Sequence, residues 1–127
     1  MNSRLEDVGM SVDAGRDVKA RLRADLRAAM KDRHTFEAKV IRALVAAIDN
    51  AEAPPIHAGQ AASIQHHFRT GSAEVERLLL SGSDVRRVLL MEIDERERAA
   101  TELERLNMME RAEALRAEVL LAKRYLE

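Results

Sequence analysis

Apolar side chains recur at intervals of three and four residues in two long stretches of this sequence, which is the spacing of one face of an α-helix. The first stretch covers about residues 17–33, is interrupted at His34-Thr35 and continues to about residue 52. Thr35 is the expected N-cap of the second helix in this stretch. Because the connection is short, the two helices are expected to be antiparallel neighbours.

The second stretch begins near Ser83, the expected N-cap of a long helix that has Asp84 in its first turn. It is interrupted at Asn107, a residue that tolerates the left-handed backbone of a helix end, and it resumes over about residues 110–126. The predicted fold class is all-α: two antiparallel helical hairpins packed together, with an irregular, partly helical middle segment. The expected inner faces carry Val18, Leu22, Leu26, Ala29, Met30, Val40, Ile41, Leu44, Val45, Ile48, Val85, Val88, Leu89, Glu92, Arg96, Ala99, Leu103, Leu106, Ala112, Leu115, Val119, Ala122 and Leu126.

The segment between the hairpins is the least regular part of the chain. Pro54 and Pro55 must end the second helix near Glu52, because proline lacks a backbone donor and restricts the residue before it. A short helix is expected from Ser72 to about Ser81. Taken with the start of the chain, this predicts a flexible N-terminal segment over residues 1–16 and a single helical domain over residues 17–127.

Composition agrees with helices and limits the chemistry. Aromatic rings occur only at Phe36, Phe68 and Tyr125, so a sheet would lack its usual packing residues. There is no cysteine, which excludes disulfides and thiolate nucleophiles. The first 16 residues lack the apolar core of a signal peptide, and no stretch reaches the roughly 18 apolar residues of a membrane span. A cytoplasmic protein with no membrane contact is expected.

Charge is divided between the two ends of the chain, although the formal net charge is only −1. Residues 16–42 hold nine basic and four acidic side chains, a balance of +5, and residues 92–118 hold nine acidic and five basic ones, a balance of −4. Several cations of the first region fall along one helix flank, where they could meet the phosphates of a nucleic acid together. The alternative is a solvated face that pairs with the acidic hairpin. The candidate nucleic-acid-binding residues are Arg16, Lys19, Arg23, Arg27, Lys31 and Arg42.

Other side chains that could carry chemistry have structural interpretations. His57, His66 and His67 match no metal-ligand spacing and are expected to be surface or packing residues. In the acidic hairpin, the spacing of charged residues predicts ion pairs on the helix surface, Glu92 with Arg96 and Asp94 with Arg98. No catalytic residue, metal site or cofactor is expected, because Ser63, Ser72, Ser81 and Ser83 are typical of caps and loops rather than of activated nucleophiles. Leu120, Leu121 and Tyr125 widen the last apolar stripe, which is typical of core packing and also compatible with a homo-oligomer contact.

The order of these segments resembles the amino-terminal helical domain of the GatB/YqeY family. The first helix ends in Ala29-Met30-Lys31 with Asp32 next, and the second carries Ile41-Arg42, Leu44, Ala47-Ile48, Asn50 and Glu52. The last hairpin resembles the long acidic hairpin of that family through Glu92-Ile93, Arg96, Arg98, Glu102-Leu103, Ala112 to Glu118 and Tyr125-Leu126. Proteins of this family continue into a small three-helix tail domain that touches tRNA, and no counterpart of that tail is expected here.

The resemblance implies an accessory protein related to tRNA-dependent amidotransferases, which belong to the glutamine-dependent carbon-nitrogen ligases. It implies no catalytic activity for this chain itself. The partners it implies are tRNA or a tRNA-processing protein, with residues 16–42 as the surface to test. The alternative is a helical protein-interaction module without a nucleic-acid role, and an independent amidase or ligase is the least favoured reading.

Overall fold

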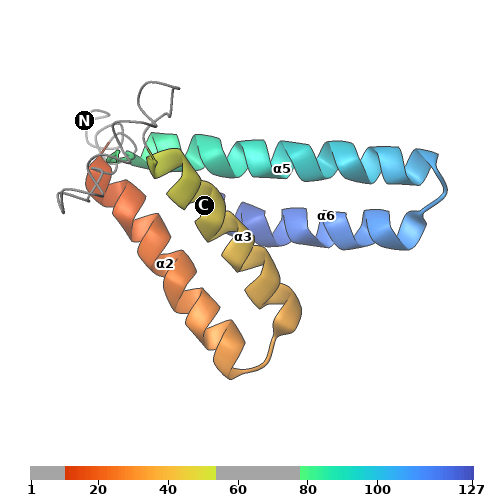
Figure 1. Ribbon diagram of the computed structural model, residues 1–127, viewed down its shortest axis with the longest axis horizontal. Helices are drawn as coiled ribbons and strands as arrows, with labels where there is room; N and C mark the ends of the chain where they lie inside the picture. Colours follow the sequence, from red (N-terminus) through yellow and green to blue (C-terminus); the bar gives the residue numbers. More distant parts are fainter. Residues whose placement is uncertain (1–10, 54–77) are drawn as a thin grey trace, which may run out of the picture.

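The computed structural model describes residues 11–53 and 78–127, and within these ranges the chain forms helices and no strands (Figure 1). Helix α2 spans Val12–Lys31 and α3 spans Thr35–Glu52. Helix α5 spans Gly82–Arg105 and α6 spans Met109–Lys123, followed by the 3-10 turn η1 at Arg124–Leu126. The predicted all-α class is confirmed, and α3 ends at Glu52 as the two prolines require.

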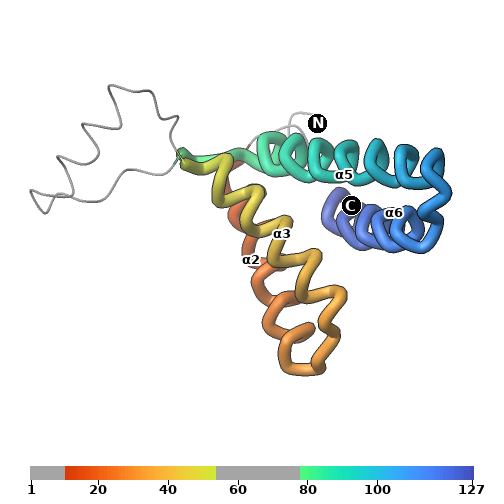
Figure 2. Tube along the Cα trace, turned by 45° about the vertical axis from the view of Figure 1, so that its right-hand side comes forward, coloured from red at the N-terminus to blue at the C-terminus, as the bar shows by residue number. Residues whose placement is uncertain are grey.

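The helices form two hairpins, α2–α3 and α5–α6. The hairpins cross near the end of α3 and the start of α5, where the chain passes from the first hairpin to the second. In each hairpin the two helices run antiparallel, and the two turns point in different directions in both views (Figures 1 and 2). Helix α5 packs on α2 and α3, and α6 packs on α3, so the crossing joins the hairpins into one core. Beyond the crossing, the outer end of each hairpin projects into solvent.

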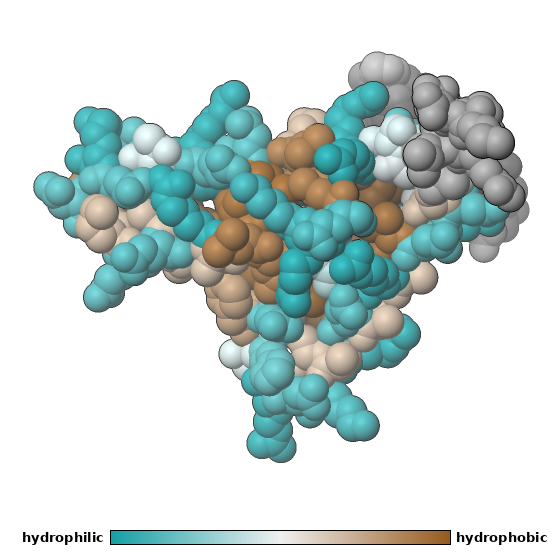
Figure 3. All heavy atoms as spheres, turned by 180° about the vertical axis from the view of Figure 1, so that it is seen from behind, coloured by the Kyte–Doolittle hydropathy of each residue, from teal (hydrophilic) through white to brown (hydrophobic). Residues whose placement is uncertain are grey.

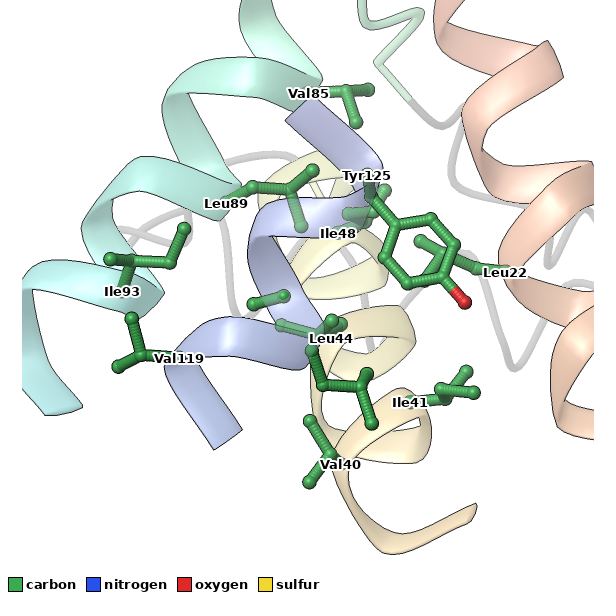
Figure 4. Close-up of a cluster of buried hydrophobic side chains, with 12 residues drawn as sticks. Leu22, Val40, Ile41, Leu44, Ile48, Val85, Leu89, Ile93, Val119 and Tyr125 are labelled. Carbon is green, nitrogen blue, oxygen red and sulfur yellow. The ribbon is translucent and has the colours of Figure 1, made fainter. Parts of the chain in front are cut away.

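The core lies at this crossing, and every described α-helix contributes to it (Figure 4). Apolar burial of this kind stabilises a fold by about 1.5–3 kcal/mol for each fully buried aliphatic side chain. Stability of either hairpin therefore depends on the other, because the side chains that fill the core come from both. The largest fully buried side chains are Leu22, Ile41, Leu44, Ile48, Leu89, Val40 and Val85.

Tyr125 of η1 brings the end of the second hairpin onto the first. Its ring is buried in the core, and its hydroxyl donates a 2.6 Å hydrogen bond to Oδ2 of Asp25 on α2. Burial, and then the Asp25 carboxylate that accepts this hydrogen bond, raise the pKa of the Tyr125 hydroxyl well above its ordinary value. The guanidinium of Arg21 lies over the ring, 4.8 Å from its centroid, and donates to the carbonyl of Arg124 at 3.2 Å.

The helix starts differ from those predicted. Helix α2 begins at Val12 instead of near residue 17, because the Ser11 hydroxyl accepts a hydrogen bond from the backbone of Ala14 and so caps an earlier turn. The N-cap of α5 is Ser81 and not Ser83, because Ser81 and Asp84 form a reciprocal capping box. The backbone at residues 78–81 is not helical, so the short helix predicted there does not reach Ser81; its other residues lie outside the described ranges.

Both hairpin turns use the same backbone motif. Arg33 and Asn107 have φ values of 59° and 60°, in the left-handed region, and each follows the C-cap of its helix. The amide after each donates back across the helix end, from His34 to the carbonyl of Ala29 at 2.8 Å and from Met108 to the carbonyl of Leu103 at 2.8 Å. Asn107 was predicted for this role and Arg33 was not. Thr35 is the first residue of α3, with His34 at the N-cap position, so the prediction of a Thr35 cap was wrong.

Several predicted inner-face positions also differ from the structure. Ala100 and Ile93 are buried on α5, whereas the predicted Ala99 is exposed. Side chains at the ends of the stripes, Met30 and Leu106, are also exposed because the hairpin tips lie beyond the crossing. On α6, Leu121 is buried but Leu120 is 69% exposed, the largest exposure of any large apolar side chain in the described residues.

Candidate functional site

The basic side chains of α2 lie mainly on one flank of the first hairpin. Arg16, Lys19, Arg23 and Arg27 recur at three-, four- and four-residue spacing, which keeps them on one side of the helix. Asp25 and Asp32 face the other side, where they line a hollow together with Glu37. We call the first of these surfaces the basic face, and include in it Lys31 of α2 and the neighbouring Arg33 and Arg42 beside the turn.

At its inner end, the basic face is neutralised by α3. The Lys19 ammonium donates 2.8 Å hydrogen bonds to both carboxylate oxygens of Glu52, which is 8% exposed, and lies 3.7 Å from Asp49 Oδ1. Arg23 lies 3.7 Å from the same Asp49 oxygen. Two of the predicted nucleic-acid-binding residues, Lys19 and Arg23, therefore hold α2 to α3, because a buried carboxylate such as Glu52 needs a cationic partner.

The outer end of the basic face has unneutralised charge. Arg27, Lys31 and Arg42 are exposed and have no acidic partner within the part of the chain that the structure describes. Arg16, at the opposite end of α2, is exposed and lies 4.0 Å from Asp13. Of the six predicted cations, Lys19 and Arg23 thus serve the fold, Arg27, Lys31 and Arg42 are available to a ligand, and Arg16 lies apart from both groups.

A hollow of about 340 Å³ lies beside these outer cations, in the groove between α2 and α3 next to the hairpin turn. Met30, Arg33 and Arg42 contribute the long side chains of its lining, with Ala29, Thr35 and Ala38 at its base. Arg33 was not among the predicted binding residues. It projects here because the turn places it in the left-handed conformation, and a pattern of helical spacing does not report such a turn.

The second hairpin is held together by a different set of charges. Arg96 donates to Glu118 at 2.9 Å and to Glu92 at 3.1 Å, and both Arg96 and Glu118 are largely buried. Burial lowers the pKa of Arg96, but the hydrogen bonds to Glu118 and Glu92 outweigh it and leave the pKa above its ordinary value. The pairs predicted at four-residue spacing form at 3.1 Å for Glu92 with Arg96 and 3.0 Å for Asp94 with Arg98. The prediction that both lie at the surface is confirmed for Asp94 with Arg98 and wrong for Glu92 with Arg96, whose side chains are mostly buried.

The remaining sequence predictions concern the serines, the histidines and metal binding. Ser81 is a cap, as expected for the serines. His57, His66, His67, Ser63 and Ser72 lie outside the described ranges. In residues 11–53 and 78–127, no three histidine or acidic side chains come together as a metal site would require.

Comparisons with protein-family models, with curated proteins and with solved structures find no match for this chain. None of the described helices combines the length and apolar content that crossing a bilayer requires. Functional inference therefore depends on the surface of the two hairpins.

Proposed function

We propose that this protein is a non-catalytic accessory factor that binds RNA through the outer end of the basic face. The observation that supports this proposal is the group Arg27, Lys31 and Arg42, three exposed cations on one hairpin tip without acidic partners among the described residues. The resemblance of the chain to the GatB/YqeY family favours tRNA as the RNA, and a place beside tRNA-dependent amidotransferases.

The side chains at this tip are suited to binding the phosphate groups of an RNA rather than its bases. The hollow is lined by guanidinium groups, a thioether and small side chains, with no aromatic ring on which a base could stack. Contacts between such cations and phosphates position an RNA backbone but carry little sequence information. Binding should therefore depend strongly on salt and weakly on nucleotide sequence.

The test is a titration of tRNA at several salt concentrations with the wild type and with Arg27→Ala/Lys31→Ala/Arg42→Ala. Each phosphate contact contributes about 0.7–0.9 to the slope of log K against log salt, so the triple substitution should lower that slope by about two to three. Affinity should fall at every salt concentration.

The matched control is Arg98→Ala/Arg105→Ala/Arg111→Ala on the second hairpin, which removes the same charge from exposed positions. It should leave tRNA affinity and its salt slope close to those of the wild type. If both triple variants lost the same tRNA affinity, the loss would be explained by net charge alone, and a localised binding site would be contradicted. Absence of tRNA binding by the wild type at low salt would rule the proposal out.

A second candidate function, a helical protein-interaction module, is favoured by one specific feature. Leu120 and Met109 are 69% and 50% exposed on the outer side of α6. Exposed large apolar side chains on the solvent side of a helix are available for a contact with another protein.

A further inference from the structure

The second hairpin carries unneutralised charge of the opposite sign from the first. In the described part of the chain, Glu110 and Glu113 on α6 are exposed and have no cationic partner, and the same is true of Glu95 and Glu97 on α5. Its arginines are mostly consumed within the hairpin, as Arg105 is by Glu102 and Arg116 by Glu104. The projecting end of this hairpin is therefore acidic.

The outer side of α6 combines these carboxylates with apolar side chains. Met109, Glu113 and Leu120 follow one another at four- and seven-residue spacing, which places them on one side of the helix, and Glu110 lies beside them. All four are exposed. We call this surface the acidic face.

The basic face of the first hairpin has the complementary arrangement. Met30 is 53% exposed and lines the hollow together with Arg33 and Arg42, and Arg27 precedes it by three residues on the same helix. On the acidic face Arg116 lies between Glu113 and Leu120 but is paired with Glu104, so the unpaired charges are those of Glu110 and Glu113. The unpaired charges of the two faces thus have opposite signs, and each face includes exposed apolar side chains.

Within one molecule these two faces do not meet. The hairpin tips point in different directions (Figures 1 and 2). The ion pairs that join the two hairpins in the described residues, Lys39 with Glu118 at 3.6 Å and Arg124 with Glu37 at 3.9 Å, involve none of the side chains that define the two faces. Seen from behind, apolar residues gather at the centre of the molecule and hydrophilic side chains cover much of the projecting ends (Figure 3). A second molecule that presents the opposite charge can compensate the charge at each tip.

We infer that the protein forms a closed dimer in which the acidic face of each copy lies on the basic face of the other. A second copy is the occupant that the charge complementarity favours, since both faces are present on the same chain. In a two-fold arrangement the same contact forms twice and both faces of both copies are covered, so no face remains for a third copy and the assembly stops at two. This inference goes beyond RNA binding and does not rest on it, but both use Arg27 and Arg42, so tRNA and the second copy should compete for the basic face.

The dimer should dissociate as salt rises, because its charges lie at the rim of the contact and are screened. The first measurement is the molar mass in solution at about 0.01 M salt, where the Debye length is roughly 30 Å, and at about 1 M, where it is roughly 3 Å. The wild type should change from twice the chain mass of 14.3 kDa to the chain mass itself. A monomer at both salt concentrations would overturn the inference, and so would a ladder of larger species.

A charge exchange separates this contact from other forms of association. Variant one is Arg27→Glu/Arg42→Glu and variant two is Glu110→Lys/Glu113→Lys; all four side chains are exposed, so both variants should fold. Each alone should be monomeric at low salt, because both of its contacts then join like charges. An equimolar mixture should form a heterodimer, because every contact again joins opposite charges. Failure of the mixture to associate would contradict the proposed pairing.

The apolar part of the contact has its own control. Leu120→Ala should weaken the dimer at low salt, whereas Leu90→Ala, at an exposed leucine of α5 outside both faces, should not. Variant two also distinguishes this inference from RNA binding, since it should lose the dimer and bind tRNA at least as tightly as the wild type. If it binds tRNA while the wild type is already monomeric, only the dimer is refuted.

Discussion

The two hairpins share a backbone plan and differ in what they show to solvent. Each consists of two antiparallel helices that are joined by a left-handed residue and contribute side chains to one core. Yet residues 16–42 carry a balance of +5 and residues 92–118 one of −4. The same backbone arrangement therefore tolerates opposite surface charge. The reason is that the fold depends on the inner side chains and a small set of buried ion pairs, which the exposed charges do not alter.

The ion pairs themselves show how the hairpins differ inside. The first hairpin buries a carboxylate, Glu52, and satisfies it with Lys19. The second buries Glu118 and satisfies it with Arg96, whose planar guanidinium also bonds Glu92. These pairs, each inside one hairpin, neutralise part of its charge, and the exposed charges that remain are mostly basic on the first hairpin and mostly acidic on the second.

The largest expected effect tests whether the two hairpins fold and unfold as one unit. Leu44→Ala removes a fully buried side chain from the shared core and should lower the free energy of unfolding by about 2–5 kcal/mol. Chemical denaturation followed by circular dichroism should show one transition for both hairpins. The control Leu120→Ala should change that free energy by less than about 0.5 kcal/mol. Two separate transitions in the Leu44 variant would show that the hairpins are independent.

The junction between the hairpins can be tested through Gly15 on α2. A Cβ at this position would overlap the carbonyl oxygen of Leu80, just before α5. Gly15→Ala should therefore lower the free energy of unfolding by about 1–3 kcal/mol, even though alanine is the better helix former. In Ala24→Gly, at an exposed position of the same helix, the reverse exchange should cost about 0.5–1 kcal/mol by propensity alone. A Gly15→Ala protein as stable as the wild type would mean that the junction is loosely packed.

The two turns provide a closer comparison, because one backbone conformation is occupied by different residues. An L-residue in the left-handed region costs roughly 1–2 kcal/mol, and asparagine tolerates it better than arginine. Arg33→Gly should raise the free energy of unfolding by about 1 kcal/mol. Asn107→Gly should give a smaller gain, measured in the same thermal or chemical unfolding experiment. Equal gains would indicate that Arg33 is no more strained than Asn107, and no gain at either position would indicate that neither residue is strained.

The smallest expected effect concerns pH and the cap of α5. The backbone and side-chain hydrogen bonds with Ser81 lower the pKa of Asp84 below its ordinary value of 3.8. A lowered folded-state pKa contributes stability that is present above 3.8 and is lost as pH falls through the folded value. The free energy of unfolding should fall less between about pH 5 and pH 2 in Asp84→Asn than in the wild type. The same pH dependence in both proteins would contradict a role for this carboxylate.

Much of the fold could be predicted from the chain, and the candidate site only in part. Helical spacing located the helices, and Pro54 with Pro55 located the end of α3. Spacing also placed the cations on one flank of α2, but it could not show that Asp49 and Glu52 neutralise Lys19 and Arg23, because those acids lie on another helix. Arg33 was missed for a related reason: its place beside the hollow comes from a turn.

The sequence by itself determined that this protein is helical, where its helices break and that its two ends carry opposite charge, because these properties follow from local spacing and composition. Only the tertiary structure decided which charges remain exposed. The packing of the two helices within each hairpin pairs Lys19 with Glu52 and Arg96 with Glu118. Arg27, Arg42, Glu110 and Glu113 are left exposed without an ion-pair partner among the described residues. Such pairing depends on distances across the fold, which no local pattern contains.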